Sequence, residues 1–366
     1  DGGSWLMERQ TGIAKRSRPR LSRVEVETCA RCHARRATLS EEYVYGQPLM
    51  NTHRVALMEE DLYYPDGQVK GEVYEYGSFL QSKMYAAGVT CHDCHNPHSA
   101  SLTASGNAVC ARCHLQGKFD TASHHHHRSP GPGSRCVDCH MPTTNFMVVD
   151  ARHDHSMRIP RPDLTLKIGS PNACSKCHAE SPPQWAADWA VKWWGSEKSS
   201  QSHYGEAIQA GRAGLPGAGQ ALSALLQDST TPGIVRATVA SLVGSNPAPN
   251  SLSTLQAALK DPDPLVRQGA LVALEEVDLP PRLSLVAPLL HDPILAVRIQ
   301  AASLLAAVPA ARLTQEQHSS LDSALAEYRR VLPDFRESDV CGSCFAVQSY
   351  RVHEDFGGDG RGDWGR

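Results

Sequence analysis

The cysteines of this chain constrain its fold more than any other feature. All 12 form C-x-x-C pairs, and in five of the six pairs the next residue is histidine. A disulfide framework places its cysteines at varied spacings, so the uniform pairing argues against one. The five pairs are Cys29 and Cys32, Cys91 and Cys94, Cys110 and Cys113, Cys136 and Cys139, and Cys174 and Cys177, followed in turn by His33, His95, His114, His140 and His178.

C-x-x-C-H is the attachment signature of heme c. Two thiols must reach the two vinyl groups on one edge of the porphyrin, and the next histidine must turn its imidazole onto the iron. One short helical turn allows all three contacts. A zinc site would need two more ligands at a distance, and a redox C-x-x-C usually occurs once, between a strand and a helix. The sequence therefore predicts five covalent heme c groups with these five histidines as proximal ligands.

Histidine is also enriched around the five sites. Of 18 histidines, nine besides the proximal ones precede residue 179. A second imidazole on each iron would use five of them, and it would suit electron transfer because it leaves no open position for a substrate. His53 and His155, isolated in polar segments, are good distal candidates, and one or two of the run His124–His127 are expected to bind. His124 or His125 together with His127 is our choice.

Three further histidines before residue 179 stand close to an attachment site or to a stronger candidate. His98 follows Pro97 just beyond the second site, too near to reach the far side of its own heme, so it would serve a neighbouring heme. His92 lies between two cysteines and is expected to face solvent, and His153 is a weaker candidate than His155. Methionine is an alternative sixth ligand, although the surplus of histidine makes it unnecessary.

The density of sites predicts how this half packs. Five sites fall within residues 29–178, which leaves too few residues to enclose each macrocycle in a protein core of its own. The hemes must then be the core, stacked against one another. We expect short helices near residues 24–36 and 77–87 and around each site, loops rich in Gly and Pro, and little sheet.

After residue 195 the composition changes and a repeat begins. Arg236, Arg267 and Arg298 recur at a spacing of about 31 residues, each after a branched apolar residue, and Asp228, Asp261 and Asp292 recur in step with them. Asp-Pro at 263–264 and 292–293 predicts helix N-termini. This pattern resembles short HEAT repeats over about residues 218–312, which implies stacked helix pairs with a docking surface.

These observations give a mainly α protein in which a loop-rich multiheme cytochrome c domain precedes an α-solenoid of HEAT-like repeats. Trp185, Trp189 and Trp193 fall on one helix face. We expect this stripe to seal the solenoid against the heme domain, with an electron relay as the alternative. The expected organisation is a heme domain at 1–180, a Trp-rich helical linker at 181–205, HEAT-like repeats at 206–332 and a disordered tail at 333–366.

Three segments carry a family resemblance. They read Gly88-Val-Thr-Cys-His-Asp-Cys-His-Asn-Pro-His-Ser99, Cys136-Val-Asp-Cys-His-Met-Pro142 and Asp154-His-Ser-Met-Arg-Ile-Pro160. They resemble multiheme cytochromes c of the nitrite reductase and hydroxylamine oxidoreductase superfamily, and more narrowly bacterial members with a C-terminal HEAT or tetratricopeptide array. The resemblance covers about residues 20–330. It implies distal ligands at His98, at His124 or His125 with His127, and at His155.

The chain departs from that superfamily in two respects. Relatives tend to carry further C-x-x-C-H sites upstream, so we expect that the natural protein has an additional N-terminal part. The catalytic heme of the nitrite reductases has lysine as its proximal ligand, and this sequence contains no C-x-x-C-K. The resemblance therefore supports the heme fold more strongly than it supports an enzymatic activity.

The sequence favours an electron-transfer protein without its own substrate site. The alternatives are an oxidoreductase of the superfamily's type, or a subunit of a polymeric extracellular cytochrome wire. Partners would be redox proteins, including other multiheme cytochromes or copies of this chain. A net charge of −3 makes nucleic acid an unlikely partner, and no apolar run is long enough to cross a membrane. Because heme c is attached outside the cytoplasm, we expect a periplasmic or extracellular bacterial protein.

The sixth pair, Cys341 and Cys344, is followed by Phe345, which cannot bind iron. It is therefore interpreted as a local disulfide or two free thiols, which leaves five hemes. The tail after it is rich in Gly and Asp and has no apolar period, so it is expected to be disordered. Its composition also fits a frame-shifted end.

Overall fold

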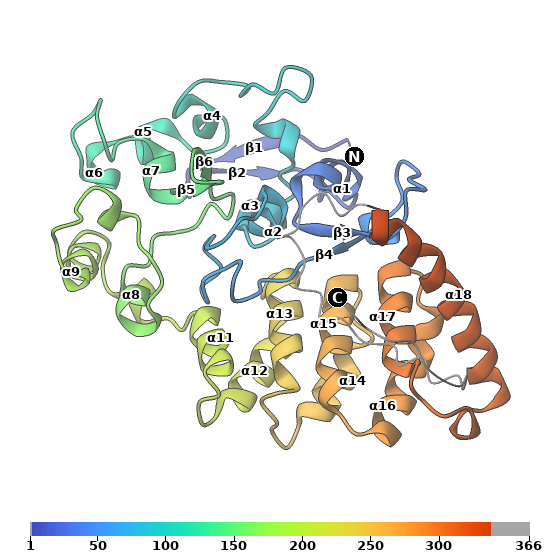
Figure 1. The fold of residues 1–366 in the computed structure, drawn as a ribbon. Helices are drawn as coiled ribbons and strands as arrows, with labels where there is room; N and C mark the ends of the chain where they lie inside the picture. Colours follow the sequence, from blue (N-terminus) through green and yellow to red (C-terminus); the bar gives the residue numbers. More distant parts are fainter. Residues whose placement is uncertain (1, 338–366) are drawn as a thin grey trace, which may run out of the picture.

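The computed structural model describes residues 2–337, with side chains through residue 330. Figure 1 shows two regions, with the heme-site half above and to one side of a row of parallel helices. Short helices and loops make up the first region. Its helices are α1 (Val24–His33), η1 (Leu49–Asn51), α2 (Glu75–Phe79), α3 (Lys83–Ala86), η2 (Cys91–Asp93), α4 (Ala108–Ala111), α5 (Gln116–Phe119), α6 (Ala122–His125), α7 (Cys136–His140), α8 (Asp163–Ile168), η3 (Cys174–Lys176), α9 (Pro183–Trp194) and α10 (Glu197–Ser200).

The sheet content of the described residues is limited to three antiparallel hairpins. They are β1 (Trp5–Glu8) with β2 (Ile13–Arg16), β3 (Arg36–Thr38) with β4 (His53–Val55), and β5 (Thr143–Phe146) with β6 (Asp150–His153). The first hairpin pairs with the third attachment site, because Ala14 N–H donates to Cys113 O and Leu115 N–H donates to Gly12 O. The expectation of a mainly helical fold with little sheet is confirmed.

The second region is a row of stacked helices, as the repeat predicts. It comprises α11 (Tyr204–Arg212), α12 (Ala218–Gln227), α13 (Gly233–Val243), α14 (Ser251–Ala258), α15 (Pro264–Ala273), η4 (Leu274–Glu276), α16 (Leu279–Val286), η5 (Ala287–His291), α17 (Leu295–Leu305), η6 (Ala310–Arg312) and α18 (Gln315–Glu337). Small and branched apolar side chains along α13, α15 and α17 form a continuous buried core, since each helix pair can bury its apolar face only against the next pair.

The periodic arginines join consecutive repeats. Arg236 pairs with Asp261, and Arg298 pairs with Glu327 in α18 at 2.9 and 3.1 Å. Between them, Arg267 makes a bidentate contact to Asp292, with nitrogen–oxygen distances of 2.7 and 2.9 Å. Each repeat therefore uses the same arginine to hold an acid of the following unit, which explains why both residues recur with one period.

The two Asp-Pro elements differ in their helix starts. Asp263 is the N-cap of α15, and its carboxylate accepts a hydrogen bond from Leu265 N–H at 3.0 Å, with Pro264 at the first helical position. Asp292 instead precedes the N-cap of α17 by two residues, and its carboxylate accepts from Ile294 N–H at 2.9 Å while it binds Arg267. The second helix start is therefore shifted from the prediction, because that aspartate serves the ion pair.

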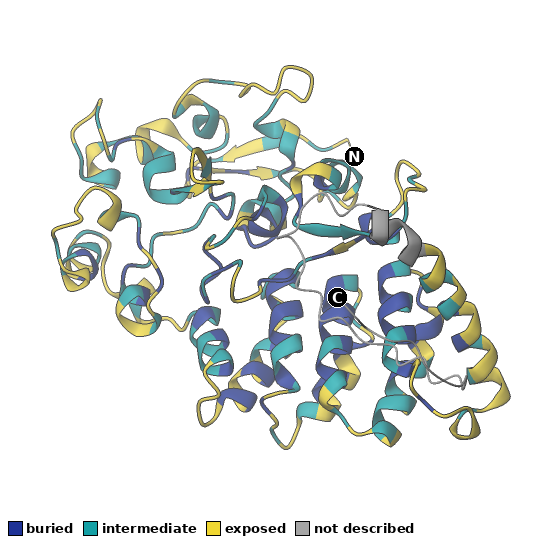
Figure 2. Cartoon of the chain, in the orientation of Figure 1, coloured by how far each residue is buried: buried dark blue, intermediate teal, exposed yellow. Residues whose placement is uncertain are grey.

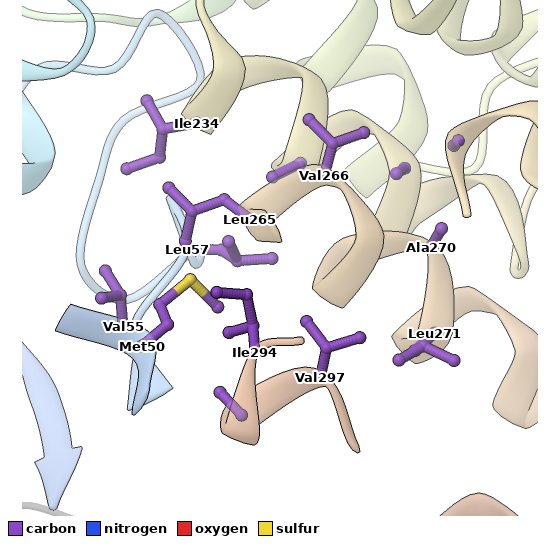
Figure 3. Packing of buried hydrophobic residues seen from close by; sticks show 14 of the residues in the cluster. Met50, Val55, Leu57, Ile234, Leu265, Val266, Ala270, Leu271, Ile294 and Val297 are labelled. Carbon is purple, nitrogen blue, oxygen red and sulfur yellow. The ribbon is translucent and has the colours of Figure 1, made fainter. Parts of the chain in front are cut away.

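A segment of the heme-site half lies across the repeats. Figure 3 shows Met50, Val55 and Leu57 beside Leu265 and Ile294. Each of three successive repeats also contributes a hydrogen bond to this segment. Met58 N–H donates to Thr238 Oγ1 of α13 at 3.0 Å, Gln268 Nε2 of α15 donates to Val55 O at 3.2 Å, and Leu295 N–H of α17 donates to Asn51 Oδ1 at 3.0 Å. Residues 50–58 therefore dock on the solenoid.

Buried apolar side chains are distributed unevenly along the chain. Figure 2 shows the most buried residues concentrated on the repeat helices and on the chain that adjoins them. Between Leu80 and Leu164, the buried apolar side chains are limited to two prolines, Pro142 and Pro162. A stretch of that length cannot offset its conformational entropy without buried apolar surface. The attachment sites from Cys91 to Cys139 all lie within it.

The C-terminal boundary of the described residues falls after Glu337, where α18 ends. The predicted tail therefore begins within this helix, and the pair Cys341 and Cys344 lies outside the described residues. Across the part of the chain that the structure covers, no helix is long and apolar enough to cross a membrane.

Candidate heme sites

Each C-x-x-C-H motif occupies a single helical turn, as its spacing predicts. In the second, third and fifth sites, the histidine N–H donates to the carbonyl oxygen of the first cysteine, at 2.9 Å in every case. The first site ends α1, and the fourth site is the whole of α7. This turn places both thiols and the imidazole close together. None of the ten cysteines of these motifs forms a disulfide, and each is at least partly exposed.

The attachment turns adjoin one another in sequence order. A hydrogen bond between the Cys29 and Cys91 thiols lowers the pKa of Cys29 to about 7, which links the first two sites. A hydrogen bond between the Cys136 and Cys110 thiols raises the pKa of Cys110, and it joins the third site to the fourth.

The second and third sites, and the fourth and fifth sites, interact through charge. Burial raises the pKa of Cys94, with smaller contributions from Asp93 and from Cys113 of the third site. Burial likewise raises the pKa of Cys139 to about 11, with Cys174 of the fifth site contributing next. Every site therefore lies within electrostatic range of the next one in chain order.

Three proximal histidines each face another imidazole. The ring centroids of His95 and His155 are 6.3 Å apart with 29° between their planes, and those of His124 and His140 are 6.2 Å apart with 14° between them. His127 and His178 are 6.3 Å apart at 44°. The structure therefore brings three of the predicted distal candidates opposite three predicted proximal ligands.

This separation fits an iron atom between the two rings. A histidine nitrogen binds a metal at about 2.0–2.1 Å, and the ring centre lies about 1.2 Å behind that nitrogen, so two axial imidazoles have centroids about 6.3 Å apart. Direct ring stacking would bring the centroids much closer. Within residues 2–337, no group of three or more His, Cys, Asp or Glu side chains forms a metal-ion site. Together with the missing apolar core, the paired rings are what bis-imidazole heme requires.

Backbone carbonyls fix the tautomer of several of these rings. His140 Nδ1 lies 2.8 Å from Arg158 O, His155 Nδ1 lies 2.8 Å from His153 O, and His127 Nδ1 contacts His125 O. A carbonyl oxygen can only accept, so Nδ1 carries the proton in each ring. Nε2 then keeps its lone pair, which is the arrangement that a metal-binding histidine needs.

Local backbone geometry explains how one short run reaches two sites. Helix α6 ends at His125, and His126 adopts a left-handed conformation with φ +55°, which turns the chain before His127. His124 and His127 therefore face different partners, His140 and His178. Gly133, with φ +79°, allows close packing at His127, because a Cβ at that position would collide with the imidazole ring.

The structure distinguishes His125 and His126 from the two histidines of the run that face a proximal ring. His125 Nδ1 accepts a hydrogen bond from His127 N–H at 3.1 Å, so its proton is on Nε2, which is the wrong tautomer for binding iron through that atom. His126 stacks on Trp193 with centroids 4.5 Å apart and planes within 7°. Between the two alternatives for the first ligand, this geometry favours His124 over His125.

The other distal candidates are not brought opposite a proximal ring. His53 is buried, and burial together with Arg36 and Arg31 lowers its pKa to about 4, so it is neutral. His98 is exposed in the loop after the second site, where its N–H donates to Asn96 Oδ1 at 2.9 Å. Met50 and Met58, two of the methionine alternatives, are buried in the core cluster that includes the repeats.

The first and third proximal histidines have other neighbours. His33 Nδ1 lies 2.9 Å from Glu75 Oε2. His114 meets Phe119 edge-on at 5.6 Å, and Phe119 also meets His124 at 5.4 Å. Sequence reasoning found neither Glu75 nor Phe119, since Glu75 lies far from His33 in the chain and a lone phenylalanine carries no pattern.

The tryptophan stripe of α9 faces the histidines and not the repeats. Trp185 contacts His178 at 4.8 Å, and Trp193 contacts both His126 and His127. Figure 1 places α9 at the opposite side of the molecule from α13 to α18. The prediction that this stripe seals the solenoid against the heme domain is therefore wrong, because α9 packs on α8 and η3, beside the fifth site.

Comparisons with known proteins match two parts of the chain. A family model described as a doubled CXXCH motif matches residues 83–119, which contain the second and third sites. A HEAT repeat model matches residues 219–306. No curated protein matches the chain.

One solved structure with some likeness is titled "Crystal Structure of Outer Cell Wall Cytochrome OcwA". It is 17% identical with a TM-score of 0.34, and the alignment covers 69% of this chain and 64% of that chain. The chain thus spans less than two thirds of the length of that cytochrome.

The matched heme-attachment motif recurs outside the matched segment, in three further C-x-x-C-H turns. The repeat model covers the helices that the periodic arginines join. The chain therefore contains a doubled heme-attachment motif, three further C-x-x-C-H turns of the same pattern, and HEAT repeats.

Proposed function

We propose that this protein is an electron-transfer cytochrome with five heme c groups arranged as a row. The thioether bonds would be made by the ten cysteines of the C-x-x-C-H motifs, and His33, His95, His114, His140 and His178 would be the proximal ligands. When bound, each heme supplies a centre that exchanges one electron reversibly. The row would follow sequence order, because each attachment turn adjoins the next.

The observation that carries this proposal is the set of three imidazole pairs. We assign His155, His124 and His127 as distal ligands opposite His95, His140 and His178 respectively. An iron with two imidazoles has no position for a substrate, and this favours electron transfer over catalysis. His53 and His98 remain proposed ligands for the first and third sites.

The missing apolar core supports the same proposal. Between Leu80 and Leu164 the chain buries only two apolar side chains of its own, those of Pro142 and Pro162. Porphyrin faces would provide the apolar surface against which these loops pack, and the exposed Leu102 and Leu115 lie in this stretch. Trp185 and Trp193 would then form the outer wall at the fifth site.

We propose that the solenoid supports this row of hemes. Residues 50–58 bond to Thr238 of α13, Gln268 of α15 and Leu295 of α17, so this face of the repeats binds the chain's own heme region. Docking of a redox partner, another multiheme cytochrome or a second copy would use other surfaces. Because heme c is attached outside the cytoplasm, we place the protein in the periplasm or outside the cell.

Intact mass and electron paramagnetic resonance (EPR) test the proposal together. The mass of the purified protein counts the hemes, and the ferric spectrum reports their ligation. We expect five hemes and only low-spin signals. One high-spin, ligand-accessible heme per chain would contradict the electron carrier and favour an oxidoreductase of the nitrite or hydroxylamine type.

A further inference from the structure

The first site differs from the fourth in what holds its proximal histidine. His140 Nδ1 donates to a backbone carbonyl, that of Arg158 at 2.8 Å. His33 Nδ1 instead lies 2.9 Å from a carboxylate oxygen, Oε2 of Glu75. A carbonyl is neutral, whereas a carboxylate carries a full negative charge on the accepting group.

Glu75 is held by a rigid element. It is the first residue of α2, and the following four residues, Tyr76 to Phe79, are all buried. Helix α2 contacts α1, which carries Cys29, Cys32 and His33. The Glu75 side chain is 27% exposed, so it is partly withdrawn from water. The pair therefore joins two packed helices.

A carboxylate that accepts the Nδ1 proton changes the ligand electronically. It draws the proton toward itself, which raises the basicity of Nε2 and fixes the ring orientation. A more basic axial ligand stabilises ferric iron more than ferrous iron, so the reduction potential falls. A neutral acceptor has a smaller effect, because it polarises the N–H bond less.

We propose that Glu75 is a positioning residue that lowers the reduction potential of the heme bound at Cys29, Cys32 and His33. This inference rests on the proposed function only in requiring a heme at that site. The competing explanation is an ordinary surface ion pair, since the His33 side chain is 63% exposed in the protein chain alone. Breaking such a pair would shift the heme potential no more than the loss of a similarly placed carboxylate does.

The chain offers a matched control for this test. His92 Nδ1 lies 2.6 Å from Glu25 Oε2, so the same two residue types form the same contact at a histidine that lies between two cysteines. The Glu25 side chain is 36% exposed and His92 is 53% exposed, which is close to the pair at the first site. His92 is not a proximal ligand, so Glu25→Gln removes an equal charge without touching an axial imidazole.

A spectroelectrochemical titration of the full chain separates the explanations. In Glu75→Gln and Glu75→Ala we expect the reduction step of the heme at Cys29 and Cys32 to shift to higher potential by more than any other step, and by more than any step shifts in Glu25→Gln. In a His33→Met background, Glu75→Gln should move nothing further, because the coupling passes through that imidazole. Unchanged reduction potentials in both Glu75 variants, or an equal shift of potential in Glu25→Gln, would overturn the proposal.

Heme mapping by peptide mass on the same samples keeps the two proposals distinct. A shortfall of hemes at the other four sites would contradict the proposed function, and the step of the first heme would still test Glu75. A chain without heme at Cys29 and Cys32 would overturn the inference about Glu75 as well.

Discussion

The imidazole rings of His124 and His140 lie 6.2 Å apart, centre to centre, with their planes 14° from parallel. Near-parallel axial imidazoles produce a rhombic low-spin ferric EPR signal. We expect His124→Ala to open one coordination position, which would convert that rhombic signal to a high-spin signal and allow carbon monoxide to bind the reduced protein. EPR and optical spectra measure both effects.

His125 is the control for this prediction. It stands next to His124 but holds its proton on Nε2, so His125→Ala should keep every heme low-spin. A high-spin heme in His125→Ala, with none in His124→Ala, would mean that the two histidines have been assigned in the wrong order.

Breaking one ion pair between repeats should destabilise the solenoid. Arg267 and Asp292 are 10% and 4% exposed, and either one alone would be a buried charge without its partner. We expect Asp292→Asn or Arg267→Met to lower the free energy of unfolding by about 3–5 kcal/mol. Urea unfolding followed by far-ultraviolet circular dichroism provides the measurement. The surface pair of Lys15 and Glu8 is the control, and its loss should leave the unfolding midpoint almost unchanged.

The docked segment should be as important for stability as the repeats themselves. Met58 is fully buried, and its N–H bonds Thr238 of α13. Met58→Ala leaves a cavity and should cost about 2–5 kcal/mol. Leu21→Ala, at a side chain that is 87% exposed, should be nearly neutral. If circular dichroism gave both variants the same unfolding midpoint, the docking of residues 50–58 would not contribute to stability.

One helix cap should make stability depend on pH. His203 caps α11 through Nδ1, which accepts from Gly205 N–H at 3.1 Å and must therefore be unprotonated. Burial lowers the pKa of His203 to about 4; Asp66 opposes this shift, and Arg158 reinforces it. The folded pKa is below the unfolded value of about 6.5, so this stability is present above pH 6.5 and is lost as the pH falls toward 4.

The size of the His203 effect follows from the shift. One pKa unit corresponds to about 1.4 kcal/mol, so the cap should lose up to about 3 kcal/mol by pH 4. His203→Asn keeps a cap without titrating in this range. The difference between the unfolding free energies of the two proteins, measured from pH 7 to pH 4.5, should grow in favour of the variant. A constant difference would contradict the prediction.

Local patterns in the sequence predicted the attachment turns and the repeats, because each depends on residues close in the chain. The spacing of Arg236, Arg267 and Arg298 indicated stacked units before any contact was known. The docking of residues 50–58 was not predictable, since the short apolar run around Val55 and Leu57 indicates burial but does not identify the helices that cover it. The direction of the Trp185 stripe was misjudged for a related reason: a periodic face indicates burial but does not identify its partner.

The candidate site also combines features that the sequence predicted with features that it did not. Composition indicated a surplus of histidine, but the choice between His124 and His125 depended on which nitrogen accepts a backbone hydrogen bond. That information comes from the turn at His126, which brings His127 N–H against His125 Nδ1. The contact between His33 and Glu75 joins distant parts of the chain and left no local signal.

The left-handed turn at His126 has a mechanical consequence for the proposed row. Only three peptide units separate His124 from His127, so their α-carbons can never be more than about 11 Å apart. The short connection between these two proposed distal ligands therefore limits how far apart the fourth and fifth iron positions can move. Electron-tunnelling rates fall steeply with distance, and thermal motion of the fold cannot lengthen the path between the proposed fourth and fifth hemes beyond this limit. The contact of Cys29 with Cys91 has no such short connection, so the separation of the proposed first and second hemes depends on the packing of α1 against η2.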